Sequence, residues 1–453
     1  MRTTHPAFFD GARTTRRRLC GLAAAAALVA VALPGVAQAS SSAPATAKAL
    51  AAIAPAHVVA NSDKVAVGFF TQWSIYSGFL EKDLATDGAA SQLTEINYAF
   101  SDVSAAGLCT SGDTWADYQR PFSAAEAVDG VADTSTQALA GNFNQLKELK
   151  AEYPKLKIVM SIGGWSWSGQ FSKIASTAAG RNAFVQSCVD QYIDGNIPGL
   201  APGAAKGIFD GLDIDWEYPN EPGNNNPYGP QDTKDYTALL RDFRSALQAQ
   251  TKTTGENYIL TADTSPNQYT AAPQLQLEQV SNAVDWLNVM TVDFHGDWEN
   301  QTDFSSNLFP DPNDPQIADD KFSVAQTVAY YESHGVKADK IALEIPYYAH
   351  AWTGVSATNN GLYQAGTASS ADSEDYTLAA AAPGTVYYDP TTASIYKYDP
   401  TSQTFYTYED PSTIFAKGLY IDVAGLRGAS VWSLDGEGTT DALTSALSSA
   451  LQY

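Results

Sequence analysis

Residues 210–219 read DGLDIDWEYP and place three carboxylates at every second position. Side chains two residues apart on a strand share a face, about 6.6 Å apart along the backbone, so Asp213, Asp215 and Glu217 are predicted to crowd together. Like charges that close cannot all ionise freely, so at least one should keep its proton near neutral pH, as a general acid requires. The alternative, a solvated acidic edge strand, does not explain the large apolar residues at the intervening positions.

Strand-like apolar runs occur at eight places along the chain, with amphipathic stretches between or after them. This alternation predicts an α/β fold, a (β/α)8 TIM barrel, with the three carboxylates on its fourth strand. A doubly wound open sheet is the alternative, but no glycine-rich phosphate loop follows the first strand. The strand-like runs are 65–73, 93–103, 157–165, 209–218, 258–263, 286–294, 340–350 and 428–434, and the helical stretches include 142–153, 181–194, 233–250, 322–334, 412–424 and 440–451.

Two connections are too long for simple loops, and long loops in compact domains tend to be functional. The first covers about 104–138, after strand two. The second, 353–410, contains further strand-like pieces and predicts a small α+β insertion domain between strand 7 and helix 7. Both leave the carboxyl end of the barrel, where such folds place their active sites, and would build walls around a groove.

The first 39 residues have the pattern of a signal peptide: an arginine-rich start, an apolar run too short to span a bilayer, and Ala-Gln-Ala before Ser40. The arginines fit the twin-arginine route and the general export route equally well. Residues 40–62 are rich in Ala and Ser and are predicted to be a flexible tether or a frayed terminus. Residues 63–453 form the predicted catalytic unit, interrupted by the insertion, of a secreted extracellular protein.

Charge and cysteine content narrow the choice of partners. Without its first 39 residues, which carry five Arg and one Asp, the chain's formal net charge changes from −24 to −28. That argues against nucleic acid or an anionic membrane as partner and suits a neutral ligand, although acidity can also serve solubility alone. Export leaves Cys109 and Cys188, either bridged or as two separate thiols.

Aromatic residues concentrate where the predicted strands end. Exposed aromatic faces suit pyranose rings, which stack their C–H faces on indole and phenol, so a neutral polysaccharide is the expected ligand. Packing of the barrel core is the competing explanation for any single ring. The aromatic residues include Trp73, Phe100, Trp165, Trp167, Tyr218, Tyr348 and Trp432.

Six motifs in order carry a resemblance to a known family. They read GFFTQW (68–73), NYAF (97–100), SIGGW (161–165), DGLDIDWEYP (210–219), IPYY (345–348) and ASVW (429–432). With these motifs the chain resembles the bacterial chitinases of glycoside hydrolase family 18, in the subgroup with an α+β insertion after strand seven. The resemblance extends across nearly all of the chain after the export segment.

The resemblance implies retaining hydrolysis of β-1,4-linked N-acetylglucosamine, with the substrate's own N-acetyl oxygen as nucleophile. Glu217 would protonate the glycosidic oxygen and then activate water, Asp215 would hold the N-acetyl N–H, and Asp213 would share a proton with Asp215. Trp432 would form the floor of the −1 sugar site, lined by Met290 and Asp293. Trp73, Trp165 and Trp167 would contact neighbouring sugars.

The partners implied are chitin and chito-oligosaccharides, and the expected form is a monomer without cofactor or metal. A cation site is the competing use of clustered carboxylates, since hard cations prefer oxygen ligands. The other functions considered are an endo-β-N-acetylglucosaminidase acting on glycoprotein glycans and a chitin-binding lectin with weak or no turnover. The presence of Glu217 argues against the lectin, because such proteins usually replace this residue.

The chain departs from the family pattern at three positions. Where relatives read Met-x-Tyr-Asp it has Val292, and valine cannot make the hydrogen bond by which that tyrosine orients the N-acetyl group. Losing a well-placed orienting contact typically costs about 10²-fold in rate. Tyr348 or a water is the candidate substitute. Phe69 and His350 stand where many relatives have Tyr and Arg.

Overall fold

Eight parallel strands close into a barrel in the computed structural model, which describes residues 64–316, 321–369 and 374–451. Strand β1 pairs with both β2 and β15, which closes the ring. The predicted (β/α)8 TIM barrel is therefore confirmed. In chain order the barrel strands are β1 (Val65–Thr71), β2 (Glu95–Val103), β4 (Lys157–Gly163), β5 (Gly211–Asp215), β6 (Ile259–Thr264), β7 (Trp286–Val289), β8 (Ile341–Pro346) and β15 (Gly428–Trp432).

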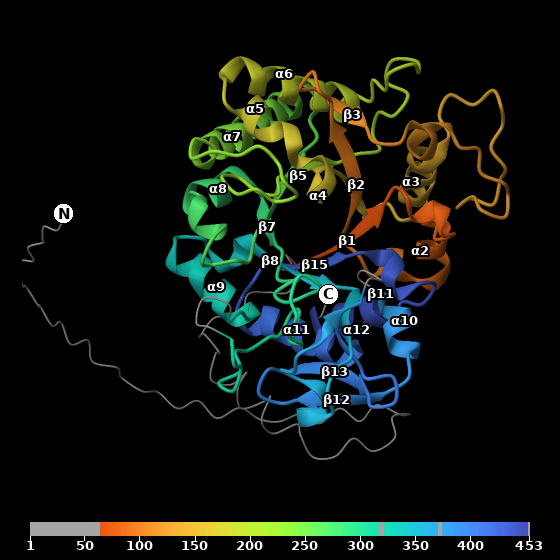
Figure 1. Ribbon diagram of the computed structural model, residues 1–453. Coiled ribbons are helices and arrows are strands. Elements are labelled where there is room, and N and C mark those ends of the chain that lie inside the picture. The colour runs from red at the N-terminus through yellow and green to blue at the C-terminus, as the bar shows by residue number, and fades with distance from the viewer. Residues whose placement is uncertain (1–63, 317–320, 370–373, 452–453) are drawn as a thin grey trace, which may run out of the picture. The chain divides into compact units, whose positions relative to one another are not determined.

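Helices surround the barrel strands in Figure 1. The longest, α7 (Asp232–Thr254), buries Tyr236, Leu239, Leu240, Phe243 and Leu247, whose spacing of three and four residues puts them on one face. It ends at Gly255, which takes the left-handed conformation of a helix C-cap. The other helices are α2 (Glu81–Asp87), α3 (Gly141–Glu152), α4 (Gly164–Trp167), α5 (Phe171–Ala175), α6 (Ala178–Cys188), α8 (Leu277–Ala283), α9 (Val324–Ser333), α10 (Tyr376–Ala381), α11 (Pro411–Val423) and α12 (Ala442–Leu451).

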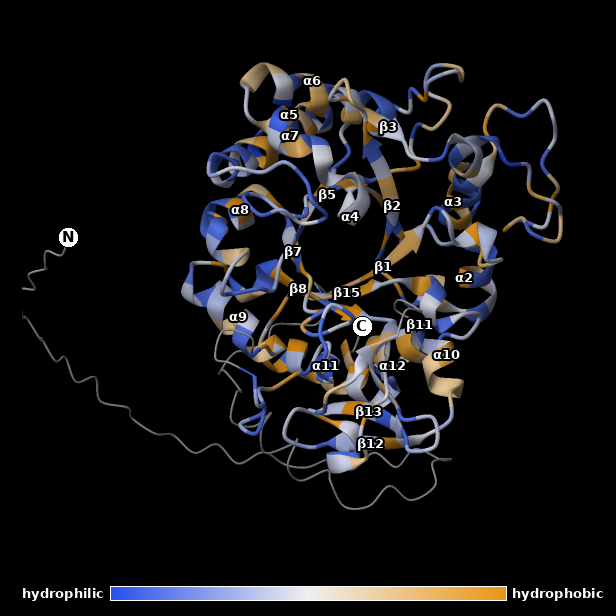
Figure 2. Cartoon of the chain, in the orientation of Figure 1, coloured by the Kyte–Doolittle hydropathy of each residue, from blue (hydrophilic) through white to orange (hydrophobic). Residues whose placement is uncertain are grey.

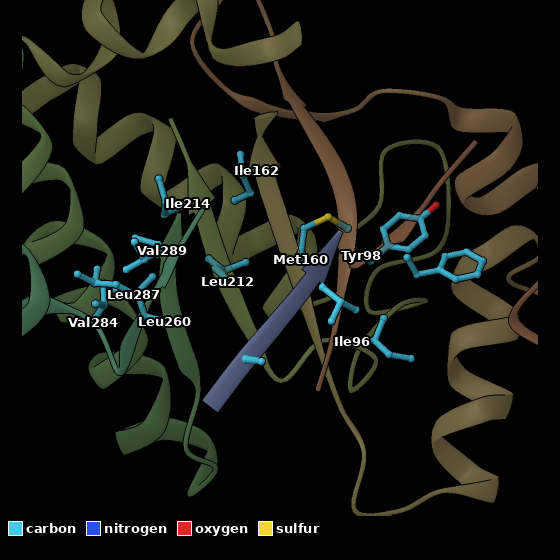
Figure 3. Close-up of a cluster of buried hydrophobic side chains, with 14 of the residues drawn as sticks. Ile96, Tyr98, Met160, Ile162, Leu212, Ile214, Leu260, Val284, Leu287 and Val289 are labelled. Atoms are coloured by element: carbon cyan, nitrogen blue, oxygen red, sulfur yellow. The ribbon is translucent and has the colours of Figure 1, made fainter. Parts of the chain in front are cut away.

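The main hydrophobic core lies between the strands and the helices. Leu212 and Ile214, the apolar residues between the carboxylates of β5, belong to it, as do Leu239 and Phe243 of α7. Figure 3 shows part of this core, with side chains contributed by neighbouring barrel strands. Figure 2 shows hydrophobic residues concentrated on the strands and hydrophilic residues on the outer loops. Because the apolar residues of β5 face the helices, its alternating carboxylates face the barrel interior.

A second, antiparallel sheet follows the seventh barrel strand, as predicted for the insertion. The run 340–350, predicted as one strand, belongs to two sheets: β8 ends at Pro346 and the next strand begins at Tyr348. Proline cannot donate to a ladder, which accounts for the break. The sheet has the order β10-β9-β14-β13-β12 and lies beside the barrel in Figure 1. Its strands are β9 (Tyr348–Thr353), β10 (Thr367–Ala368), β12 (Thr385–Asp389), β13 (Ser394–Asp399) and β14 (Thr404–Tyr408), and β11 (Glu374–Asp375) pairs with β9.

After β2 the chain turns back and forms β3 (Cys109–Ser111), which pairs antiparallel with β2, and then continues to α3. Cys109 is bridged to Cys188 at the end of α6, with a Cα–Cα distance of 5.1 Å, so the pairing left open by the sequence is formed. The predicted signal peptide 1–39 and tether 40–62 lie outside the described residues. Within the described ranges, no helix is both long and apolar enough to cross a membrane.

Candidate active site

A groove of about 1650 Å³ opens at the carboxyl ends of the barrel strands. Eleven of the twelve predicted site residues line it, and Asp213 lies beneath. The walls also include residues 297–301, from the long connection between β7 and α9. The eleven are Trp73, Phe100, Trp165, Trp167, Asp215, Glu217, Tyr218, Met290, Asp293, Tyr348 and Trp432.

Asp213 is completely buried in the barrel and surrounded by hydrogen-bond donors. Ser161 Oγ donates to its Oδ2 at 2.7 Å, while Thr261 Oγ1 and Asn288 Nδ2 donate to its Oδ1. Ser161 and Thr261 belong to β4 and β6, the two strands that pair with β5, and Asn288 belongs to β7, the next strand around the barrel. Asp213 is thus held from three sides and cannot reach the groove itself.

Asp215 and Glu217 lie above Asp213 and are also buried. Burial, followed by repulsion from Glu217 and Asp213, raises the pKa of Asp215 well above its ordinary value. Burial raises the pKa of Glu217 to about 7, although a hydrogen bond with Tyr218 acts in the opposite direction. The protonated acid expected from the sequence pattern is therefore present, and Glu217 keeps its proton into the neutral range.

The loop after β4 positions this part of β5. Ser168 Oγ accepts a hydrogen bond from the backbone N–H of Glu217 at 3.0 Å and lies 3.2 Å from the carbonyl oxygen of Asp215. Gly163, at the end of β4, has a φ of 113°, and a Cβ there would come within 2.2 Å of the same carbonyl oxygen. Only glycine permits this close approach of the two strands.

Two further buried acids face the same space and were not predicted from the sequence. Asp263 is the last residue but one of β6, and Glu344 lies in β8. Burial and neighbouring carboxylates raise the pKa of both well above ordinary values. An acid inside an otherwise apolar strand run, as both are, is the signal that would have identified them.

Asp263 lies close enough to Asp213 and Asp215 for their negative charges to contribute to its raised pKa. Neither of its carboxyl oxygens has a hydrogen-bond partner among the described residues. Asp213 also acts on Asp215, whose pKa its negative charge helps to raise. The proton shared between Asp213 and Asp215, which the family resemblance implies, stays a prediction.

Aromatic rings form the floor of the groove. Trp432, at the end of β15, stacks on Phe100 with ring centroids 5.4 Å apart and lies 5.3 Å from Phe69. Trp73 extends this cluster and is 43% exposed, while Trp165 is half exposed beside it on the groove wall. Trp167 packs over Gly112, where a Cβ would come within 2.0 Å of the indole. The exposed faces offer stacking surfaces for several sugar rings.

A wall opposite Asp215 is built from the segment after β7 and from β9. Tyr348 Oη donates a hydrogen bond to Asp293 Oδ1 at 2.6 Å, and His350 Nε2 lies 2.8 Å from the same oxygen. Met290 and Val292 are buried in this wall. Trp298, which was not predicted from the sequence, is exposed in the groove and packs its ring edge-to-face with His350.

Among the described residues, no group of three or more His, Cys, Asp or Glu side chains is arranged to hold a metal ion. Hydrolysis of a glycosidic bond needs an acid that is protonated at working pH, together with surfaces that hold sugar rings. Glu217 and the aromatic floor supply both within one groove. Fold and site therefore define a glycoside hydrolase.

Comparison with known proteins identifies the family. The family model described as Glycosyl hydrolases family 18 matches residues 65–437. The chain is 36% identical to Chitinase C of Streptomyces lividans over 388 residues, covering 83% of this chain and 57% of the relative. It is also 36% identical to Chitinase 63 of Streptomyces plicatus over 403 residues, covering 86% and 61%. This chain belongs to glycosyl hydrolase family 18, as the sequence motifs predicted.

Solved structures agree with this assignment. The catalytic domain of the psychrophilic chitinase B from Arthrobacter TAD20 superposes with a TM-score of 0.82 at 34% identity, covering 88% of this chain and 97% of that one. Against the two Streptomyces chitinases, the chain spans only about three fifths of the relative's length.

Proposed function

We propose that this protein is a chitinase that hydrolyses β-1,4-linked N-acetylglucosamine polymers and oligomers with retention of configuration. The observation that carries the proposal is Glu217, an acid that burial keeps protonated near neutral pH, at the base of an aromatic groove. The names of the related proteins, which are chitinases, support the same substrate.

In the proposed mechanism Glu217 gives its proton to the glycosidic oxygen as the bond to the anomeric carbon breaks. The carbonyl oxygen of the substrate's own acetamido group forms the new bond to that carbon, which produces an oxazolinium intermediate. Glu217, now ionised, removes a proton from the incoming water, whose oxygen attacks the anomeric carbon and reopens the ring. The two displacements together retain the configuration.

Asp215 is proposed to hold the acetamido N–H during these steps. Its Oδ1 is buried without a hydrogen-bond partner among the described residues, so it is a free acceptor beside Glu217. A buried acceptor left unpaired costs about 1–3 kcal/mol, which a bound N–H would recover. Trp432 and its neighbours are proposed to carry the sugar ring in the −1 site.

The test is product analysis on a chito-hexamer and on a high-mannose glycoprotein, with wild type beside Glu217→Gln. We expect wild type to release short chito-oligosaccharides whose nascent reducing ends are the β-anomer, detected by NMR, and Glu217→Gln to retain only a low residual rate. Cleavage of the glycoprotein alone would favour an endo-β-N-acetylglucosaminidase. Activity on neither substrate would refute the enzyme, and near wild-type activity of Glu217→Gln would refute the mechanism.

We also propose that the protein is exported. The composition of residues 1–39 supports this, with basic residues before an apolar run and a small-residue cleavage site. Mass spectrometry of the protein collected from the culture medium should find Ser40 as its first residue. A secreted protein that still carries residues 1–39 would contradict the proposed cleavage.

A further inference from the structure

The proposed −1 site has an acceptor for the acetamido N–H but needs a separate donor for the acetamido carbonyl oxygen. An acetamido group presents one donor and one acceptor, and a site that pairs only the N–H leaves the group free to rotate about its bond to the sugar ring. Since the carbonyl oxygen is the proposed nucleophile, its direction decides how often it meets the anomeric carbon.

The hydroxyl groups of two tyrosines on the walls are already in use. Tyr348 donates its only hydroxyl hydrogen to Asp293 Oδ1 at 2.6 Å, so it does not serve as the substitute donor considered from the sequence. Tyr218 is hydrogen-bonded to Glu217. The Nε2 of His350 faces Asp293.

Two buried acids that line the groove, Asp263 and Glu344, have carboxyl groups with no hydrogen-bond partner among the described residues, and Glu344 is the one in β8, four residues before Tyr348. Glu344 lies in β8 and pairs with Ser430 of β15. This pair is two residues further from the groove mouth along the strands than the pair formed by Pro346 and Trp432. Its side chain therefore enters the barrel beneath the ring of Trp432. Glu344 is only 5% exposed, yet it lines the groove.

The carboxyl group of Glu344 has no hydrogen-bond partner within the ranges that the structure describes. Its backbone is held in place, because Thr291 Oγ1 donates to its carbonyl oxygen at 2.7 Å. Glu217, Asp293 and Asp213 are the charged groups that act on it most strongly, which places it within the same acid cluster.

We propose that the Glu344 carboxyl group donates a hydrogen bond to the acetamido carbonyl oxygen of the sugar bound above Asp215. The inference rests on the proposed function and adds to it the residue that orients the nucleophile. Asp215 of β5 would then accept a hydrogen bond from the acetamido N–H, and Glu344 of β8 would donate one to the acetamido C=O.

A carboxyl group can donate only while it is protonated. Burial, followed by repulsion from Glu217 and Asp293, raises the pKa of Glu344 well above its ordinary value and so favours its protonated form. An apolar or like-charged site can keep an acid neutral so that it serves as a donor. Glu344 would contribute by orienting the acetamido group and not by activating it, because a hydrogen bond to the attacking oxygen withdraws electron density from that oxygen.

The arrangement also selects the substrate. A glucosamine unit without its acetyl group offers no carbonyl oxygen to Glu344 and brings an ammonium group to the site. We therefore expect Glu344 to contribute to turnover only where the −1 sugar is N-acetylated.

The test compares Glu344→Gln, whose amide still donates, with Glu344→Met, which has similar length and no donor. Both are assayed on a fluorogenic chitobioside, and their melting temperatures are compared with wild type. We expect Glu344→Met to lower kcat by about 10²-fold with KM changed less than about threefold, and Glu344→Gln to stay within about fivefold of wild type. If Glu344 had only a structural role, the kcat values of Glu344→Met and Glu344→Gln would not separate in this way.

If Glu344→Met does not fold, Glu344→Asp replaces it, since its acid is one methylene too short to reach the same oxygen. The proposal is overturned if the donor-free or shortened variant keeps kcat within about threefold of wild type, or if Glu344→Gln falls as far as that variant. A wild-type protein without turnover would instead count against the proposed function.

Discussion

We expect kcat/KM to fall about tenfold for each pH unit above about pH 7, because only the protonated form of Glu217 can donate to the glycosidic oxygen. The pKa of this group is raised from 4.5 to about 7, first by burial and then by the negative charge of Asp293. In the free enzyme this pKa sets the alkaline limb of the profile.

The fraction of Glu217 that carries its proton follows from the size of its pKa shift. A rise from 4.5 to about 7 corresponds to roughly 3 kcal/mol in favour of the neutral form. At pH 6 about 90% of Glu217 molecules would carry the proton, against about 3% for a solvated glutamate. Burial therefore increases the active fraction at pH 6 about thirtyfold.

The assay measures kcat/KM on a soluble chito-oligosaccharide between pH 4 and 9, with Tyr218→Phe beside wild type. The hydrogen bond with Tyr218 lowers the pKa of Glu217, so its removal should move the alkaline limb to higher pH. Glu217→Gln is the control and should show only a low, flat residual rate. A wild-type limb with its midpoint below about pH 5.5, or a limb that moves down in Tyr218→Phe, would refute the reasoning.

Three further outcomes are expected. Val292→Tyr adds a hydroxyl to the groove wall and should raise kcat on chito-oligosaccharides. The increase should be larger when Glu344→Met is also present. An unchanged kcat with and without Glu344→Met would contradict the idea that a donor on this wall orients the acetamido group. Burial raises the pKa of Glu81 to about 8, so the free energy of unfolding of wild type should fall by roughly 3 kcal/mol between pH 4.5 and 7. The melting temperature of Glu81→Gln, measured relative to wild type, should therefore rise from pH 5 to pH 8. A difference that stays constant with pH would show that Glu81 is not the group responsible. Replacing Cys109 and Cys188 together by Ala opens a loop of 79 residues and should cost about 4 kcal/mol in urea unfolding, whereas a loss below about 1 kcal/mol would show that the bridge adds little.

Local patterns were sufficient to predict most of the fold. Each of the eight strand-like runs overlaps a barrel strand, because burial imposes a local apolar pattern that can be read without knowing the partners. The ends of these runs were predicted less well. The run 157–165 continues past β4 into the short helix α4, and 340–350 passes from the barrel into the insertion sheet at Pro346. Apolar composition continues across these boundaries, while the hydrogen-bonding partners change.

The candidate site was predictable where its residues are close in the sequence, although β5 ends at Asp215 and Glu217 lies two residues beyond it, not inside the strand as predicted. Asp213, Asp215 and Glu217 follow each other at the strand period, so their common direction is visible in the sequence. Cys109 and Cys188 could be named but not paired, because spacing alone does not fix the distance between them. Asp263 and Glu344 were missed, since each is a single acid in a separate apolar run.

The alternating carboxylates of residues 210–219 alone established a buried strand in which at least one acid keeps its proton, and the motifs around them indicated the family. Only the tertiary structure decided which acids come together: Asp263 of β6 and Glu344 of β8 line the same groove as Asp215 and Glu217. Side-chain direction along one strand follows from its two-residue period. Contacts between strands depend on the order and register in which the barrel closes, and those are set by packing across the whole chain.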